Sequence, residues 1–256
     1  GYDLSTITYS PDGRLYQLEY AQKAVSESGT AMGVRCKDGV VLAVEKVLSS
    51  PMMVKTSGKK LHRVAGHLAV AVSGIAADAR QLVNKAVEEV TAYKRNFAED
   101  ITPKALAERL AGFLHAYTCY WYLRPFGASV IVAGVDMESG THELWMAEPT
   151  GDVARYFGVA AGKGTRAAKT EIEKGRFMDK TCEEALPEIA RVLHTVHDAS
   201  RDKPFQIDMY WVAEGSQWKA GPVPADLVKA ADAAGKAAAG QGGAAAAAAD
   251  GKEVDE

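Results

Sequence analysis

The glycine-rich stretch GVAAGKGTRAAK, residues 158–169, is a part of the sequence whose residue types could support chemistry. A glycine loop that enters a helix can hold a phosphate group with its backbone N–H groups. A phosphate-binding P-loop needs four residues between its glycines and a serine or threonine directly after its lysine. Here three residues separate Gly158 from Gly162, and a glycine stands between Lys163 and the next threonine. The spacing therefore favours an ordinary glycine turn between a strand and a helix.

His194 and His197 lie three residues apart in a predicted helix, with Asp198 beside them, and such residues can bind metal ions. A zinc site, however, uses three or four protein ligands. Histidines are also favoured in the last turn of a helix, because the helix dipole stabilises a cation there. We therefore expect no metal site and no cofactor in this chain.

The stretch HAYTCYWYLRPFG, residues 115–127, gathers aromatic side chains around a single basic residue, Arg124. Aromatic and basic side chains together can stack on nucleic-acid bases. One arginine supplies little positive charge, and aromatic residues at the end of an amphipathic helix are common in cores and at protein interfaces. We expect this stretch to pack in the core and to anchor an interface.

The overall composition is that of an ordinary soluble surface. The 256 residues carry a formal net charge of -3, which argues against a nucleic-acid partner. No apolar run reaches the ~18 residues that a membrane span needs. Cys36, Cys119 and Cys182 are odd in number and widely spaced, and no signal peptide precedes them. We therefore expect reduced thiols, a location in the cytoplasm and nucleus, and neither a membrane nor a nucleic acid as partner.

Periodic apolar residues predict the elements that must position any site. Apolar runs on both sides of Asp38-Gly39 predict a β-hairpin over residues 30–46, since this dipeptide favours a tight turn. Thr102 before a proline predicts a helix start, and Thr181 with Glu184 forms a capping box for another helix. The other expected elements are helices at 78–95 and 165–176, strands at 67–74, 128–136, 142–148, 153–158, 159–162 and 205–214, and a last helix from Pro224.

The order of these elements predicts an α+β fold. Continuously apolar strands, such as VVLAV at 40–44, indicate sheets that are buried on both faces. Helix pairs between strand pairs then predict two stacked antiparallel sheets with helices outside, a four-layer α/β/β/α sandwich. We divide the chain into an N-terminal segment with a helix at 1–29, a sandwich domain at 30–230 and a tail at 231–256. The tail is low in complexity, broken by glycine and acidic at its end, so we expect it to be disordered.

Residues 29–46, GTAMGVRCKDGVVLAVEK, resemble the opening hairpin of an N-terminal nucleophile hydrolase. In that class, processing makes a threonine the first residue, and its own α-amine acts as the base. A lysine lowers the pKa of the nucleophile, and an aspartate orients the group. The resemblance implies that the predicted sandwich has the fold of this class.

The first residues carry a longer and more specific resemblance. YDLSTITYSPDGRLYQLEYA, residues 2–21, follows the N-terminal signature of the alpha-type subunits of the proteasome. The similarity to that family runs from residue 1 to about residue 215 and includes GIAADAR at 74–80 and RPFG at 124–127. Leu4, where most alpha subunits have arginine, resembles the type that occupies the seventh place in the eukaryotic alpha ring.

This resemblance implies a subunit without peptidase activity. Gly29 falls on the nucleophilic threonine of the related beta subunits when Gly33 is matched to their early glycine. Thr30 then comes one place late, Glu45 falls on the orienting aspartate, and the catalytic lysine has no clear match. The helix before Gly29 also leaves no α-amine there. The alternatives are an active threonine hydrolase and a nucleotide-binding α/β protein that uses residues 158–165.

The resemblance also assigns a role to the N-terminal helix and to the segment before it. In the family, the helix lies across the mouth of the closed cleft and packs on its neighbours in a seven-membered ring. The preceding segment belongs to the gate of the axial pore, whose open form is held by a Tyr-Asp-Pro-Tyr cluster. The matching residues here are Tyr2, Asp3, Pro11 and Tyr20.

A second implied site is the pocket between adjacent alpha subunits that accepts the C-terminal tails of activators. The pocket lysine of the family matches Lys60, with Gly74 and the turn of GIAADAR nearby. The implied partners are the neighbouring alpha subunits, the beta-ring subunits and regulatory particles. The sequence is thus interpreted as a non-catalytic alpha-ring subunit that acts in assembly, pore gating and docking for ubiquitin-dependent degradation.

Overall fold

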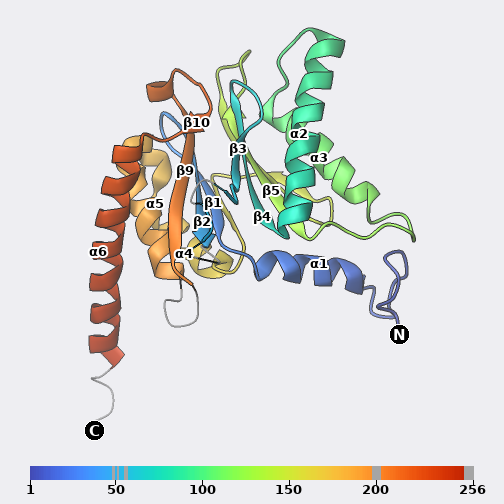
Figure 1. Ribbon diagram of the computed structural model, residues 1–256, viewed down its shortest axis with the longest axis horizontal. Helices are drawn as coiled ribbons and strands as arrows, with labels where there is room; N and C mark the ends of the chain where they lie inside the picture. The colour runs from blue at the N-terminus through green and yellow to red at the C-terminus, as the bar shows by residue number, and fades with distance from the viewer. Residues whose placement is uncertain (48–49, 51, 55–56, 198–202, 251–256) are drawn as a thin grey trace.

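The computed structural model describes residues 1–47, 50, 52–54, 57–197 and 203–250, with side chains through residue 239. In this part of the chain, two five-stranded antiparallel sheets stack together and helices cover their outer faces (Figure 1). The elements are α1 (Tyr16–Ser26), β1 (Ala31–Arg35), β2 (Gly39–Val47), β3 (Leu61–Arg63), β4 (Leu68–Gly74), α2 (Ala76–Phe97), α3 (Pro103–Ala116), β5 (Ala128–Val135), β6 (His142–Ala147), β7 (Val153–Arg155), β8 (Gly158–Ala161), α4 (Thr165–Gly175), α5 (Cys182–Val196), β9 (Phe205–Ala213), β10 (Gly221–Pro222) and α6 (Ala225–Asp250).

The strand order defines two sheets with different helical covers. The first sheet has the order β10-β9-β2-β1-β8, and the second has the order β3-β4-β5-β6-β7. β1 and β2 pair as an antiparallel hairpin in which Arg35 lies opposite Val40, which confirms the turn predicted at Asp38-Gly39. Helices α4, α5 and α6 cover the first sheet, while α2 and α3 cover the second (Figure 1).

Strand β2 shows why a buried strand can be continuously apolar. Val41 and Ala43 pack in the cluster that joins the first sheet to α5. Val40, Leu42 and Val44 point the other way and pack between the two sheets. Because successive side chains of a strand point to opposite faces, a strand covered on both faces needs no polar alternation. The α/β/β/α sandwich predicted from such strands is confirmed.

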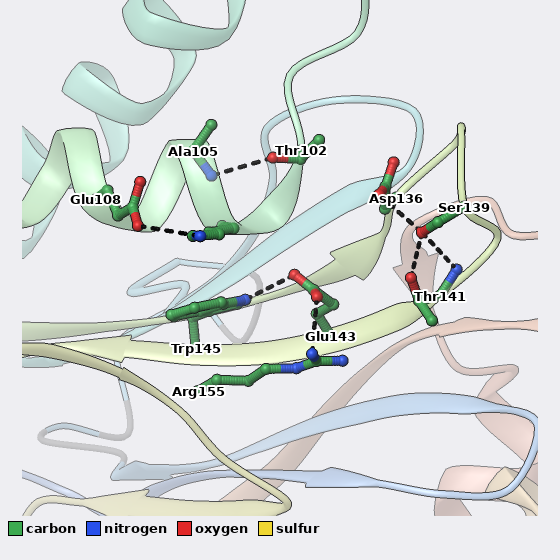
Figure 2. Close-up of polar contacts among 10 residues, drawn as sticks. Thr102, Ala105, Glu108, Asp136, Ser139, Thr141, Glu143, Trp145 and Arg155 are labelled. Carbon is green, nitrogen blue, oxygen red and sulfur yellow. Dashed lines mark hydrogen bonds and ion pairs between the residues drawn. The ribbon is translucent and has the colours of Figure 1, made fainter.

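Two helix starts follow the capping signals of the sequence. The Thr102 side chain accepts a hydrogen bond from the backbone N–H of Ala105 at 3.1 Å, at the start of α3 (Figure 2). At α5, Thr181 and Glu184 form the predicted capping box, with the Glu184 carboxylate accepting from the Thr181 backbone N–H at 2.8 Å. These bonds satisfy N–H groups that have no partner inside a helix. Both predicted starts are therefore confirmed.

The C-terminal segment differs from the predicted disordered tail at 231–256. α6 continues to Asp250, so the predicted boundary at residue 230 falls inside a helix (Figure 1). Ala231 is buried against α5, and a Cβ at Gly235 would lie 2.5 Å from the backbone nitrogen of Arg191. Small residues thus let the two helices approach closely, and this packing adds to the high helix propensity of the alanines, which offsets the cost of the glycines. Residues 251–256 lie outside the described residues.

Helix α1 lies across one end of the sandwich, where it contacts β4 and β5 (Figure 1). Ala21 and Val25 are its buried residues, and Val25 belongs to the cluster between the sheets. Leu15 and Leu18, at the start of the helix, are only half-buried. The C-terminal half of α1 is therefore anchored to its own chain, while its first half leaves apolar surface available. Among the described helices, none is both long and apolar enough to cross a membrane.

Candidate functional site

The start of β1, where a nucleophile would stand in a hydrolase of this fold, is occupied by Gly29 and Thr30. Thr30 is 1% exposed, and its backbone N–H donates to the Glu45 carboxylate at 2.9 Å. Its hydroxyl accepts from the backbone N–H of Gly164 at 3.2 Å. The nitrogen and the hydroxyl of Thr30 therefore both serve structural hydrogen bonds, and the nitrogen lies in a peptide bond. In the chain as described, the Thr30 nitrogen is thus an amide and not the free α-amine on which this class of nucleophile relies.

Glu45, predicted at the position of the orienting carboxylate, does lie next to Thr30 and also binds a histidine. Its other oxygen lies 2.6 Å from Nδ1 of His197, and the two side chains are 6% and 8% exposed. His194 instead pairs with Asp232 of α6 at 2.6 Å. The two histidines considered as metal ligands are thus bound in separate networks. Asp198 lies outside the described residues, and the described part holds no group of three or more metal-binding side chains.

Gly29 lies in the continuous backbone between the end of α1 and Thr30, and it is held by hydrogen bonds from other parts of the chain. Its carbonyl oxygen accepts from the Ser73 hydroxyl at 3.2 Å and from the Lys60 amine at 3.3 Å. Ser28, just before it, shares a hydrogen bond of 2.6 Å with Ser73. A Cβ at Gly162, which has a φ of +100°, would lie 2.8 Å from the Gly29 oxygen. Glycine is therefore required where the β8–α4 turn approaches the end of α1.

The predicted P-loop alternative is not supported by this turn. β8 runs antiparallel to β1, whereas the nucleotide-binding alternative required a parallel sheet. The backbone N–H of Lys163 donates to the Ser28 carbonyl at 2.9 Å. The glycine-rich stretch is the predicted turn between strand and helix, and it holds α1 in place.

Lys60 is a residue that sequence reasoning did not connect with the closed cleft. It precedes β3, and its amine reaches the carbonyl oxygens of Gly29 at 3.3 Å and Glu45 at 3.4 Å. Burial lowers the pKa of Lys60, and the nearby charge of Glu45 offsets part of that shift. The bonds are long, so the amine is weakly held and could bind a better acceptor.

The two residues predicted for the activator pocket, Lys60 and Gly74, line one groove of about 340 Å³ together with Arg80 of α2. Gly74 has a φ of +126°, and a Cβ there would lie 2.2 Å from the Gly127 oxygen. A side chain at this position would therefore disturb the wall of the groove. The structure brings the two predicted residues together, and their role in binding stays a prediction.

An ion pair joins the two sequence motifs GIAADAR and RPFG, which lie far apart in the chain. Asp78 of GIAADAR accepts two hydrogen bonds from the Arg124 guanidinium of RPFG, at 2.7 and 2.8 Å. The backbone N–H of Gly127 also donates to Asp78 at 2.8 Å. The Arg124 hydrogen bond is the main cause that holds the pKa of Asp78 below its ordinary value. This clamp fixes the start of α2, which forms one wall of the groove.

The predicted gate residues lie on and before α1. Gly13 donates its N–H to the Ser10 carbonyl at 2.9 Å, so Pro11 stands inside a tight turn. Tyr2 and Tyr20 are about half exposed, and Gln17 donates to the backbone oxygen of Asp3. Within the described residues, no hydrogen bond joins the side chains of Tyr2, Asp3 and Tyr20. The Tyr-Asp-Pro-Tyr cluster stays a prediction.

The aromatic stretch at 115–127 divides into a packed part and an exposed part. Tyr117 and Phe126 pack together with ring centroids 4.7 Å apart, as expected for core residues. Trp121 is 76% exposed, and its neighbours in the same loop are also exposed. Thr6 donates to the Tyr120 carbonyl at 3.3 Å, so this loop holds the N-terminal segment. The interface expected for the exposed part stays a prediction.

The fold and this site define a sandwich of the N-terminal nucleophile hydrolase type in which α1 precedes β1 and the Thr30 backbone N–H is bound to Glu45. A model of the proteasome subunit family matches residues 25–212, and a model of the N-terminal signature of proteasome A subunits matches residues 2–24. The chain therefore belongs to the proteasome subunit family and carries the signature of its alpha-type members.

Individual relatives agree with this assignment. The chain is 47% identical to "Proteasome subunit alpha type-3" of Oryza sativa subsp. japonica, over 93% of this chain and 95% of that relative. It is 49% identical to the alpha type-3 subunit of Acanthamoeba castellanii, over 91% of each chain. It is 40% identical to "Probable proteasome subunit alpha type-7" of Saccharomyces cerevisiae, over 82% of this chain and 74% of that relative. The predicted resemblance to the alpha type-3 subunit is confirmed.

Proposed function

We propose that this chain is a non-catalytic subunit of the proteasome alpha ring that helps to assemble the ring, to gate its axial pore and to dock regulatory particles, in the cytoplasm and nucleus. The observation that carries the proposal is the start of β1. Gly29, which the resemblance matches to the nucleophile, follows α1 after residues 27–28, and both polar groups of Thr30 are engaged in hydrogen bonds within their own chain. Peptide bonds are then cut by other chains of the particle.

The first test is the mass of the native assembly that contains a tagged copy of the chain, with peptidase assays on the chain alone and on the assembly. A particle of several hundred kilodaltons with activity confined to the assembly is the expected result. Peptidase activity in the isolated chain would support the threonine hydrolase alternative and contradict the proposal.

Replacing Thr30 with alanine tests the absence of catalysis directly. The variant is expected to leave the peptidase activity of the assembly unchanged, because the hydroxyl accepts a structural hydrogen bond from Gly164. Loss of that acceptor leaves a buried N–H group unpaired and lowers the free energy of unfolding by about 1–3 kcal/mol. The two quantities are measured by peptide hydrolysis and by urea unfolding. A loss of peptidase activity in a fully assembled particle would identify Thr30 as a nucleophile.

The gating role predicts a gain of activity when the N-terminal segment is removed. Deleting residues 2–9 leaves the turn at Pro11 and all of α1 in place, so ring packing is expected to persist. The basal hydrolysis of short peptides by the assembled particle is then expected to rise several-fold, because an obstacle at the pore entrance is removed. Native mass provides the control for assembly. Unchanged basal hydrolysis in a complete particle would show that this segment does not restrict entry.

The docking role predicts that the Lys60 amine binds the terminal carboxylate of an activator tail. A carboxylate would replace two weak contacts with carbonyl oxygens and would stabilise the ammonium charge that burial opposes. Lys60→Ala is expected to weaken stimulation by tail peptides about tenfold, since a charge-assisted hydrogen bond contributes on the order of 1–3 kcal/mol.

Lys59→Ala is the matched control, because Lys59 lines the same groove and is exposed. It is expected to leave stimulation unchanged. If Lys59→Ala weakened the response and Lys60→Ala did not, the assignment of the pocket lysine would be wrong by one position.

A further inference from the structure

Two arginines lie near each other at an edge of the sandwich, at the opposite end of β1 from Gly29. Arg35 ends β1 in the first sheet, and Arg155 ends β7 in the second. Residues 156–157 connect β7, an edge strand of the second sheet, to β8, an edge strand of the first sheet. The Arg35 backbone N–H donates to the Phe157 carbonyl at 2.8 Å, and the Arg35 guanidinium lies 5.5 Å from the centre of the Phe157 ring. One crossing segment therefore brings both cations to the same place.

The carboxylate beside these arginines, Glu143, has a partner on each of its oxygens, and neither partner is Arg35. One oxygen of Glu143 lies 3.2 Å from the Arg155 guanidinium, and the other accepts from the Trp145 indole N–H at 2.8 Å (Figure 2). Among the described residues, no carboxylate pairs with Arg35, and its Nε is buried without a hydrogen-bond partner. Burial and then the charge of Arg155 lower the pKa of Arg35, while Glu143 raises it in part. The cluster thus has one more cation than its own chain neutralises.

The surroundings of Arg35 point to a protein as the missing partner. The Phe157 side chain is 68% exposed, and that of Arg155 is 41% exposed. Exposed aromatic side chains beside arginine are typical of protein interfaces, where both residue types are enriched. A guanidinium presents a planar set of donors that matches the two oxygens of a carboxylate.

We infer that Arg35 and Arg155 form a docking site for an aspartate or glutamate side chain of a neighbouring proteasome subunit, in a contact that also covers Phe157. The inference rests on the proposed function, because it requires the chain to sit in a multi-subunit particle. Charged side chains also protect exposed sheet edges from unwanted pairing, which would explain Arg155. It does not explain Arg35, because β1 lies inside its sheet between β2 and β8.

The direct test is chemical cross-linking of the assembled particle with a tagged Arg35→Lys variant. A carbodiimide condenses an amine and a touching carboxylate to an amide, and the carbodiimide takes up the water as a urea. An arginine does not react in this way, so the substitution introduces the amine at this position. We expect an amide between the introduced amine and an aspartate or glutamate of another subunit, identified by mass spectrometry of the digested particle.

The control is Arg95→Lys, which places an amine on the exposed last turn of α2. It is expected to give no linkage, or a linkage to a different carboxylate. A linkage from position 35 only to Glu143 of the same chain, or no linkage in an intact particle, would overturn the docking site. If the tagged wild-type chain were absent from any large particle, the proposed function itself would fail, and the two outcomes are therefore distinguishable.

A second variant tests the contribution of the same contact to assembly. Arg35→Gln removes the charge at a half-buried position, and the released fraction of the tagged chain is measured after a salt step. Loss of a charge pair at an interface acts mainly on dissociation, so we expect release to be about tenfold faster than for wild type. Arg95→Gln is the control and should release at the wild-type rate. Equal release rates for Arg35→Gln and wild type would contradict the inference.

Discussion

Glu45→Ala is expected to lower the free energy of unfolding of the chain by about 3–5 kcal/mol, because it removes one member of a buried pair. The carboxylate binds both the Thr30 backbone N–H and the His197 ring, and both partners are nearly inaccessible to water. Without it, two buried polar groups lose their partner, and water cannot easily replace it. Urea unfolding of the purified chain, followed by fluorescence or circular dichroism, measures the change.

Glu173→Ala is the matched control, since Glu173 is an exposed glutamate on α4. A surface substitution of this kind changes stability by no more than about 0.5 kcal/mol. If Glu45→Ala were as stable as Glu173→Ala, the network around Thr30 would not contribute to the fold. The structural role assigned to its hydrogen bonds at the start of β1 would then have to be abandoned.

Asp78→Ala is expected to lower stability at neutral pH by about 2–3 kcal/mol. The Asp78 side chain is 8% exposed and accepts from the Gly127 backbone as well as from Arg124. Since the Arg124 side chain is 65% exposed, solvent screens that ion pair, and the buried backbone bond carries much of the effect. The change is measured by urea unfolding at about pH 7.

The same residue predicts a pH dependence with a definite sign. In the folded chain, the hydrogen bond from Arg124 holds the pKa of Asp78 below the ordinary value of an aspartate side chain. Its contribution is therefore present above the unfolded pKa and is lost as the pH falls through the folded pKa. The stability gap between wild type and Asp78→Ala should shrink on acidification below about pH 4. The difference in stability between Asp78→Asn and Asp78→Ala should not change with pH through this site, because asparagine cannot ionise. If that difference shrank on acidification as the wild-type difference does, the assignment of the pH dependence to Asp78 would be wrong.

Local signals in the sequence predicted most of the fold. Asp38-Gly39 marked the β1–β2 turn, Thr102 and Thr181 marked helix starts, and these depend on residues close together in the chain. β3 was missed, because a three-residue strand carries too little periodicity to recognise. The start of α6 near Pro224 was predicted, but its continuation beyond residue 230 was missed, because the glycines of that segment, Gly235 among them, were interpreted as helix breakers. The actual role of Gly235, allowing close contact with α5, depends on a partner that the local sequence does not reveal.

The candidate site was predicted in its residue types more than in its contacts. Aligning the hairpin with a known class singled out Gly29, Thr30 and Glu45, and the structure brings these three residues together at the start of β1. The partner of Glu45 is His197, which is 152 positions away and was considered only as a metal ligand. The pairing of Asp78 with Arg124 likewise joins two distant motifs. Such contacts depend on how the sheets stack, and a single sequence carries no direct record of that stacking.

The uninterrupted backbone from α1 into β1 also determines how the chain responds to covalent inhibitors. An electrophile that closes a ring across the hydroxyl and the α-amine of a terminal threonine needs both groups in one residue. In this chain the Thr30 nitrogen is a backbone amide that donates a hydrogen bond to the Glu45 carboxylate. The Thr30 hydroxyl accepts a hydrogen bond from the Gly164 backbone N–H. Such a compound would leave this chain at its native mass while it shifts the mass of any chain with a terminal threonine. Within one particle, this chain would therefore serve as an unlabelled internal standard for inhibitor occupancy.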